Sequence, residues 1–141
     1  MKTIDVNIPL EEINKISKDT MLEKLGIEFT ELGPNYLKAK MPVDERTFQP
    51  MKLLHGGANA ALMETLGSFG SHLLIDQRTE AAVGLEINAN HLGSARSGWV
   101  EGIAKIIHQG RSTHVWQIDI FNEEGKLIST GRLTNLIKKM I

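Results

Sequence analysis

The 141-residue sequence predicts an α+β fold in which a mostly antiparallel sheet wraps around one long helix. The segment from Gly56 to about residue 75 has helical length and few charged residues. Four stretches after residue 76 alternate polar and apolar side chains, as half-buried strands do. The connections between these stretches are too short for the crossover helices of a parallel sheet, so neighbouring strands are expected to run antiparallel.

Two short helices are expected at the start of the chain. Residues 9–18 place apolar side chains at helical spacing, and Pro9 stands near the beginning of this segment, where proline is favoured. Asp19 or Thr20 caps a second helical turn that runs to Leu25 and ends at Gly26.

Two strands follow, over residues 27–32 and 36–43. In the second strand Leu37, Ala39 and Met41 share one face. A turn at residues 33–35, which contains glycine, proline and asparagine, joins the strands. Residues 44–54 are expected to form a loop.

The long helix contains many glycines, alanines and serines, which include Gly56, Gly57, Gly67 and Gly70. Glycine in particular is unfavourable in a helix interior. A helix of this composition suits a site where another layer, such as a sheet, packs very close to it.

Period-two patterns define the later strands. The residues expected to share a face are Val83, Leu85, Ile87, Ala89 and His91 in the first strand, Val100, Gly102, Ala104 and Ile106 in the second, and Trp116, Ile118 and Ile120 in the third. The last strand covers residues 127–137. Hairpin turns are expected at residues 109–110 and 122–125.

Composition excludes several classes of function. The net charge is −1 and no basic block is longer than Lys138-Lys139, so nucleic-acid binding is not expected. The absence of cysteine excludes disulfides, thiolate metal sites and thiol catalysis. The histidines lack any recognised metal-binding spacing, so no metal is expected. No apolar run could span a bilayer and no signal peptide is visible near the start, so we expect one cytoplasmic domain over residues 1–141.

The candidate catalytic residues lie in the stretch from Gln49 to Ser68. A loop with Gln49 and His55 leads into Gly56, where the long helix begins with free N–H groups and the positive end of its dipole. Such a helix start suits a developing oxyanion. Glu64 lies among apolar neighbours without a lysine or arginine three or four residues away, so we expect a partly buried carboxylate available as a general base. The alternatives are a surface glutamate and a loop histidine that merely caps the helix through its backbone.

Helix geometry separates these two groups. Gly56 and Glu64 are eight residues apart, so they lie about 12 Å apart along the axis. A base must lie within about 3.2 Å of the atom it serves, or one water away. If both groups belong to one site, Glu64 must come from a second subunit, which predicts a dimer with composite sites. Ser68, one turn after Glu64, would come from the same subunit as Glu64.

These residues resemble the hotdog-fold acyl-CoA thioesterases, and among them the 1,4-dihydroxy-2-naphthoyl-CoA hydrolases and related aryl- and acyl-CoA thioesterases. The resemblance rests on the entry His55-Gly56-Gly57, on Glu64, and on the strands at residues 83–91 and 116–121, and covers about residues 21–136. It implies a hotdog fold, a dimer with a continuous sheet assembled into a homotetramer, and hydrolysis of an aromatic or medium-length acyl-CoA, as in menaquinone biosynthesis. Coenzyme A would enter as part of the substrate, with no other cofactor.

The resemblance also implies roles for individual residues. Glu64 would act as nucleophile or general base, the Gly56 amide would polarise the thioester carbonyl with help from Gln49 and His55, and Ser68 and His91 would line the acyl pocket or position water. The residues implied to hold coenzyme A are Gly84, His91, Leu92, Gly93, Ser94, His108, Gln109, Gly110, Arg111, Ser112 and Thr113. Some relatives carry a basic residue where this chain has Leu92-Gly93, which leaves Arg96 and Arg111 as candidates for the phosphates.

Three alternatives stay open. The turn at residues 110–113 has a glycine, a cation and two hydroxyls, which suit a phosphate but also occur in ordinary turns. A hotdog dehydratase or hydratase would use a histidine and a carboxylate as an acid–base pair, but its proline-rich histidine loop is represented here only by Pro50. A non-catalytic acyl-CoA-binding protein is the third possibility.

Overall fold

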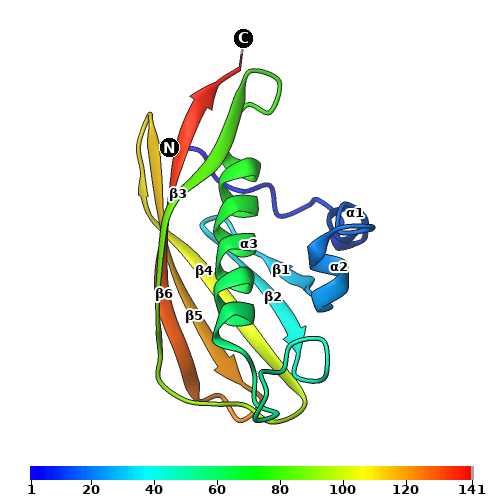
Figure 1. Ribbon diagram of the computed structural model, residues 1–141. Coiled ribbons are helices and arrows are strands. Elements are labelled where there is room, and N and C mark those ends of the chain that lie inside the picture. Colours follow the sequence, from blue (N-terminus) through cyan, green and yellow to red (C-terminus); the bar gives the residue numbers. More distant parts are fainter. Residues whose placement is uncertain (141) are drawn as a thin grey trace.

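The computed structural model describes residues 1–140 and has the α+β architecture that the sequence predicts (Figure 1). The elements in chain order are α1 (Leu10–Lys15), α2 (Met21–Leu25), β1 (Glu28–Leu32), β2 (Tyr36–Pro42), α3 (Gly56–Leu74), β3 (Glu80–His91), β4 (Trp99–Gln109), β5 (Thr113–Asn122) and β6 (Leu127–Lys139). All neighbouring strands pair antiparallel in one sheet of order β1-β2-β4-β5-β6-β3. β1 and β3 therefore form the two edges of the sheet.

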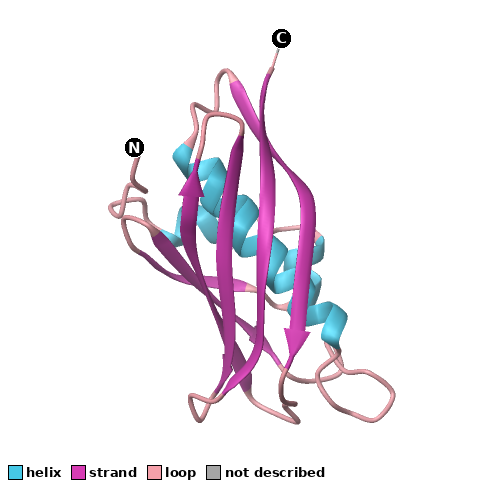
Figure 2. Ribbon diagram, turned by 90° about the vertical axis from the view of Figure 1, so that its left-hand side faces the viewer, coloured by secondary structure: helices cyan, strands magenta, loops and turns pink. Residues whose placement is uncertain are grey.

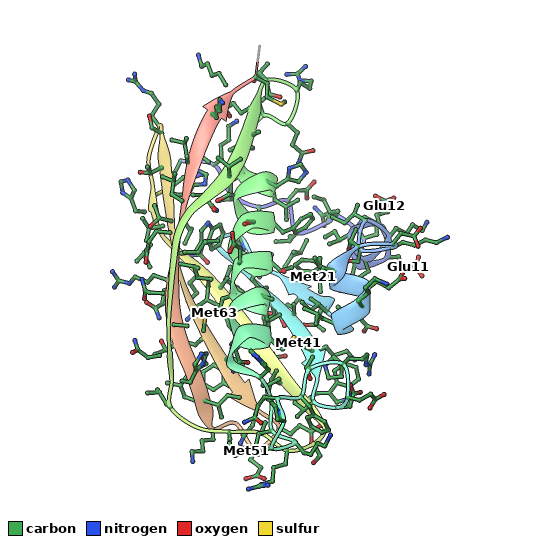
Figure 3. All side chains as sticks on the ribbon, in the orientation of Figure 1. Glu11, Glu12, Met21, Met41, Met51 and Met63 are labelled. Carbon is green, nitrogen blue, oxygen red and sulfur yellow. The ribbon has the colours of Figure 1, made fainter. Side chains whose placement is uncertain are left out.

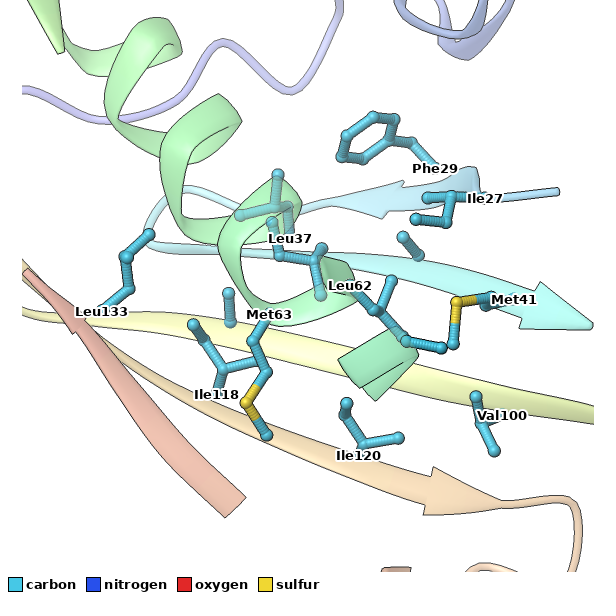
Figure 4. Packing of buried hydrophobic residues seen from close by; sticks show 14 of the residues in the cluster. Ile27, Phe29, Leu37, Met41, Leu62, Met63, Val100, Ile118, Ile120 and Leu133 are labelled. Atoms are coloured by element: carbon cyan, nitrogen blue, oxygen red, sulfur yellow. The ribbon is translucent and has the colours of Figure 1, made fainter. Parts of the chain in front are cut away.

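The sheet curves around α3, which lies along one of its faces (Figures 1 and 2). Leu62, Met63 and Leu66 of α3 are fully buried against the strands, together with Trp116 and Leu133. Figure 4 shows Leu62, Met63 and Leu133 in this layer. Met41 and Met63 lie between α3 and the sheet, whereas Met21 lies on α2 (Figure 3). The hydrophobic core is thus the layer between α3 and the sheet.

The small residues of α3 allow the close approach that the sequence predicts. A Cβ on Gly70 would lie 2.5 Å from the Trp116 ring, and a Cβ on Gly67 would lie 2.5 Å from Leu133. Carbon atoms in contact normally lie about 3.5–4.0 Å apart. The sheet therefore packs on backbone at these two positions.

The first helix is shorter than predicted. α1 ends at Lys15, and the next three N–H groups donate to carbonyls three residues back instead of four, so the chain tightens into turns through residue 18. Thr20 caps α2 by accepting a hydrogen bond from the Leu22 N–H at 3.2 Å, and Gly26 ends it in the left-handed conformation, as predicted.

Asn14 joins α1 to the edge strand β1. Its Oδ1 accepts a hydrogen bond from the Phe29 N–H at 2.8 Å, and its Nδ2 donates to the Phe29 carbonyl at 3.1 Å. The side-chain amide thus pairs with Phe29 as the backbone of a neighbouring strand would.

The predicted face of β3 is wrong in its first half. The pairing of β3 with β6 shifts between Gly84 and Glu86, which is a β-bulge. One extra residue inverts the alternation of faces. Ile87 and Ala89 pack against the core as predicted, whereas Val83 and Leu85 are exposed, at 44% and 58%.

Candidate active site

The loop before α3 is closed by backbone hydrogen bonds. The Gln49 N–H donates to Leu53, and the His55 N–H donates to Thr47, both at 2.8 Å. The Leu54 N–H donates to Ala95, beyond the end of β3, at 2.9 Å. Met51 lies in this loop at the end of the molecule where α3 begins (Figure 3). These bonds fix the path along which His55 enters the helix.

His55 caps α3 through its ring and leaves one amide free. Its Nδ1 accepts a hydrogen bond from the Gly57 N–H at 2.7 Å, so this ring is neutral and carries its proton on Nε2. The Gly56 N–H, at the first position of α3, has no acceptor within residues 1–140. His55 thus caps the helix through its ring as well as through its backbone carbonyl, which accepts from the Ala58 N–H at 2.9 Å, and the cap leaves the Gly56 amide available.

His91 packs directly on Gly56. A Cβ on Gly56 would lie 2.7 Å from His91 Nε2, so only glycine fits without a shift of the ring. The other ring nitrogen, Nδ1, is hydrogen-bonded to Ser129 Oγ at 3.0 Å. The structure thus brings the end of β3 to the start of α3.

Gln49 is half-buried in the loop beside this helix start. Its Oε1 accepts a hydrogen bond from the Met51 N–H. Its Nε2 donates to no group of the described chain. The side chain therefore has a free donor, as its predicted role requires.

Glu64 is exposed in the single chain, so the predicted partial burial is wrong for one protomer. Its carboxylate forms no hydrogen bond or ion pair within residues 1–140. Oε2 lies 2.5 Å from the position that a Cβ on Gly84 would take, so the carboxylate rests against the bulge of β3. Because β3 is the edge strand, the sheet continues no further and leaves the side chain open. Ser68 is half-buried one turn later.

The residues predicted to hold coenzyme A divide between the two ends of the sheet. His91 and the segment 92–94 lie at the end where α3 begins, and the N–H groups of Leu92 and Gly93 both donate to Ile128. The turn at residues 108–113 lies at the opposite end, where Ser112 accepts a hydrogen bond from the Ile137 N–H (Figure 1). Gly84 lies between them, against Glu64. One chain therefore does not bring these residues together.

One hollow in the surface lies away from these residues. It has a volume of about 950 Å³, lies between α1, α2 and β1, and includes none of the predicted site residues. No group of three or more histidine, cysteine or acidic side chains in the described chain is placed to hold a metal ion. No helix of this part is long and apolar enough to cross a membrane.

A buried polar network lies behind the helix, and sequence analysis missed it. Ser71 Oγ accepts hydrogen bonds from Trp116 Nε1 at 2.8 Å and from Asn135 Nδ2 at 2.9 Å, and lies 2.9 Å from His114 Nδ1. With two donors on its oxygen, the Ser71 hydroxyl donates to His114. Burial lowers the pKa of His114, which agrees with this neutral, accepting ring. The only sequence sign of the network is that Asn135 follows Leu133 on the inward face of the last strand.

Comparison with known proteins identifies the family. The family model described as the thioesterase superfamily matches residues 51–129. The chain is 47% identical over 130 residues to the 1,4-dihydroxy-2-naphthoyl-CoA hydrolase of Escherichia coli K12, covering 92% of this chain and 95% of that protein. It is 44% identical over 131 residues to the proofreading thioesterase EntH of Cronobacter turicensis, covering 93% and 95%.

A solved structure agrees with the sequence comparison. The crystal structure of the Q49A mutant of thioesterase PA1618 from Pseudomonas aeruginosa matches with a TM-score of 0.95 and 43% identity, covering 98% of this chain and 99% of that one. The expected hotdog fold is thereby confirmed. The chain belongs to the thioesterase superfamily and is a thioester hydrolase.

Proposed function

We propose that the protein hydrolyses acyl-CoA thioesters to the free acid and coenzyme A, at a site shared by two copies of the chain. The observation that carries this proposal is the layout of α3. Its first residue has a free N–H, and an unpaired carboxylate follows two turns later at Glu64. The two groups lie about 12 Å apart along one helix, so one substrate carbonyl can meet both only if they come from different chains.

The chemistry follows from these two groups. The thioester oxygen would accept a hydrogen bond from the Gly56 N–H at the positive end of α3, where developing negative charge is stabilised. The free Nε2 of Gln49 and the protonated Nε2 of His55 supply further donors at this end. Glu64 from the other chain would take a proton from the attacking water, or would itself attack the carbonyl carbon.

Strand β3 offers the surface for this pairing. It is an edge strand, and Val83 and Leu85 expose apolar side chains beside the bulge. Two copies joined along β3 around a two-fold axis would continue the sheet and set their α3 helices antiparallel, so that each helix start lies near the middle of the other helix. The same pairing would bring residues 91–94 of one copy toward residues 108–113 of the other. Two such dimers would form the expected tetramer.

For the acyl group we propose an aromatic ring system such as 1,4-dihydroxy-2-naphthoyl. The named activity of the Escherichia coli relative supports this choice. The relative named as a proofreading thioesterase is nearly as similar, so the substrate test needs a panel that includes other aromatic and medium-length acyl groups.

The test is release of thiol from a panel of aryl- and acyl-CoA thioesters by the purified protein, with Glu64→Ala in parallel. We expect release by the wild type and a loss of at least about 100-fold in the variant, because the general base or nucleophile is gone. Circular dichroism checks that the variant is folded. Acyl-CoA binding without thiol release would contradict the proposal and favour a binding protein, and formation of an unsaturated acyl-CoA would favour a dehydratase.

A further inference from the structure

Gly84 and Asn135 are directly paired across strands β3 and β6. Both face α3, because the Asn135 side chain bonds to that helix and a Cβ on Gly84 would meet Glu64. Gly84 has no side chain, and Glu64 Oε2 lies 2.5 Å from the point where its Cβ would be. The Glu64 carboxylate therefore occupies the place of a cross-strand neighbour of Asn135.

The orientation of the Asn135 amide is fixed by two hydrogen bonds. Nδ2 donates to the Gly67 carbonyl at 3.1 Å and to Ser71 Oγ at 2.9 Å. A carbonyl oxygen only accepts, so the nitrogen of the amide must be the atom that faces Gly67. Ser71 is itself held by Trp116 and His114. The Asn135 side chain thus cannot turn without breaking this network.

The remaining atom of the amide has no partner. Asn135 is fully buried, and its Oδ1 accepts no hydrogen bond from residues 1–140. Leaving a buried acceptor unpaired costs free energy, so such an atom calls for an explanation. Oδ1 lies 3.9 Å from the same point above Gly84 that Glu64 Oε2 approaches to 2.5 Å. The unpaired oxygen and the carboxylate flank one small space.

We propose that Asn135 is a positioning residue for Glu64, and that its Oδ1 accepts a hydrogen bond from the proton that Glu64 carries during turnover. This inference rests on the proposed thioesterase function. A carboxylate oxygen and an amide Oδ1 both only accept, so without a proton between them the two oxygens cannot bond and Oδ1 stays unpaired. The nearest titratable side chain of the network, His114, reaches Asn135 only through Ser71.

The proton balance of the step is simple. Water attacks the thioester carbon while Glu64 removes one of its protons, and the new carboxylic O–H can donate to Asn135 Oδ1. The carbon–sulfur bond then breaks, and the same proton passes from Glu64 to the departing thiolate. The products are the carboxylic acid and the thiol of coenzyme A, and the carboxylate is restored. Asn135 holds the protonated intermediate form of Glu64 in one orientation.

The kinetic test compares two variants of the network. Asn135→Leu keeps similar volume but removes Oδ1, and we expect kcat to fall about 10- to 100-fold with KM changed less than about threefold. Ser71→Ala removes one of the two bonds to Nδ2 but leaves Oδ1 and the bond to Gly67 in place, and we expect a clearly smaller fall in kcat than in Asn135→Leu. An unchanged kcat in Asn135→Leu, or an equal loss in Ser71→Ala, would overturn the proposal.

A stability measurement tests the contact without any activity. Glu64→Gln places a donating N–H where the protonated carboxyl would be, whereas Glu64→Met removes the same charge but donates nothing. We expect Tm of Glu64→Gln to exceed that of Glu64→Met by about 3 °C, and the difference to disappear in an Asn135→Leu background. Equal Tm values for the two variants would overturn the contact.

The two measurements separate this inference from the proposed function. If the wild type releases no thiol while the difference in Tm is found, the thioesterase proposal fails and the contact stands. If the wild type is active and depends on Glu64, but neither kcat nor Tm responds as described, the positioning role fails and the thioesterase proposal stands.

Discussion

At the scale of single residues, Gly56 has two roles at the start of α3. Its N–H must stay free at the start of α3, and its missing side chain makes room for His91. His55, which precedes it, has an extended backbone with φ −68° and ψ 131°. This conformation is also the one that a residue before proline adopts.

These facts allow the amide to be tested by itself. Gly56→Pro removes the N–H at the first helical position, where proline is best tolerated, while Gly56→Ala adds the same Cβ near His91 but keeps the N–H. We expect Gly56→Pro to lose about 100- to 1000-fold in kcat, as for removal of one oxyanion donor, and Gly56→Ala to lose at least tenfold less. Thiol-release kinetics on both variants measure how much the Gly56 N–H contributes to kcat. Equal losses would mean that crowding of His91, not the donor, is responsible.

The residues of the candidate site could be predicted where they are close in the sequence. Gln49, His55, Gly56 and Glu64 lie within one short stretch, and helix geometry relates them. Asn135 could not be predicted, because its contact with the Glu64 region arises only from the pairing of β3 with β6. The exposure of Glu64 could not be predicted either, because the apolar residues next to it in the sequence lie on other faces of the helix.

At the scale of elements, local sequence signals, namely periodicity, helix caps and turn residues, predicted the helices and strands of the described chain. The β3 bulge could not be predicted, because a local pattern does not show how a strand pairs with its neighbour. Val83 and Leu85 continue an apolar alternation, and one extra residue between Gly84 and Glu86 leaves no mark in such a pattern. The close packing of α3 on the sheet, in contrast, could be predicted from the glycines of the helix.

That close packing gives a stability prediction. Gly→Ala inside a helix normally stabilises by about 1 kcal/mol. A Cβ on Gly70 would lie 2.5 Å from Trp116, whose ring is buried and held by Ser71. We therefore expect Gly70→Ala to lower the free energy of unfolding by about 1–3 kcal/mol, as overpacked cores do. Urea denaturation measures the free energy of unfolding. A gain in stability would contradict the prediction and show that α3 and the sheet can move apart with little loss of free energy.

At the scale of the whole molecule, composite sites predict complementation between two inactive variants. Glu64→Ala lacks the carboxylate and Gly56→Pro lacks the donor, but a mixed dimer contains one complete site. If the variants are unfolded together, refolded and allowed to pair at random, half of the dimers are mixed and each has one of two sites, so we expect about a quarter of the wild-type activity. Activity no higher than that of either variant alone would mean that each site belongs to one chain.

The bond pair between Asn14 and Phe29 has a consequence for how copies of the chain can add to one another. A sheet with two free edges can accept a further strand at each side, and such units can grow into fibres. Here the β1 edge is already occupied at Phe29 by a side chain of the same molecule, whereas β3 has no such cover. If copies of the chain add to one another by strand pairing, only the β3 edge is open, so growth by this route would stop at two copies.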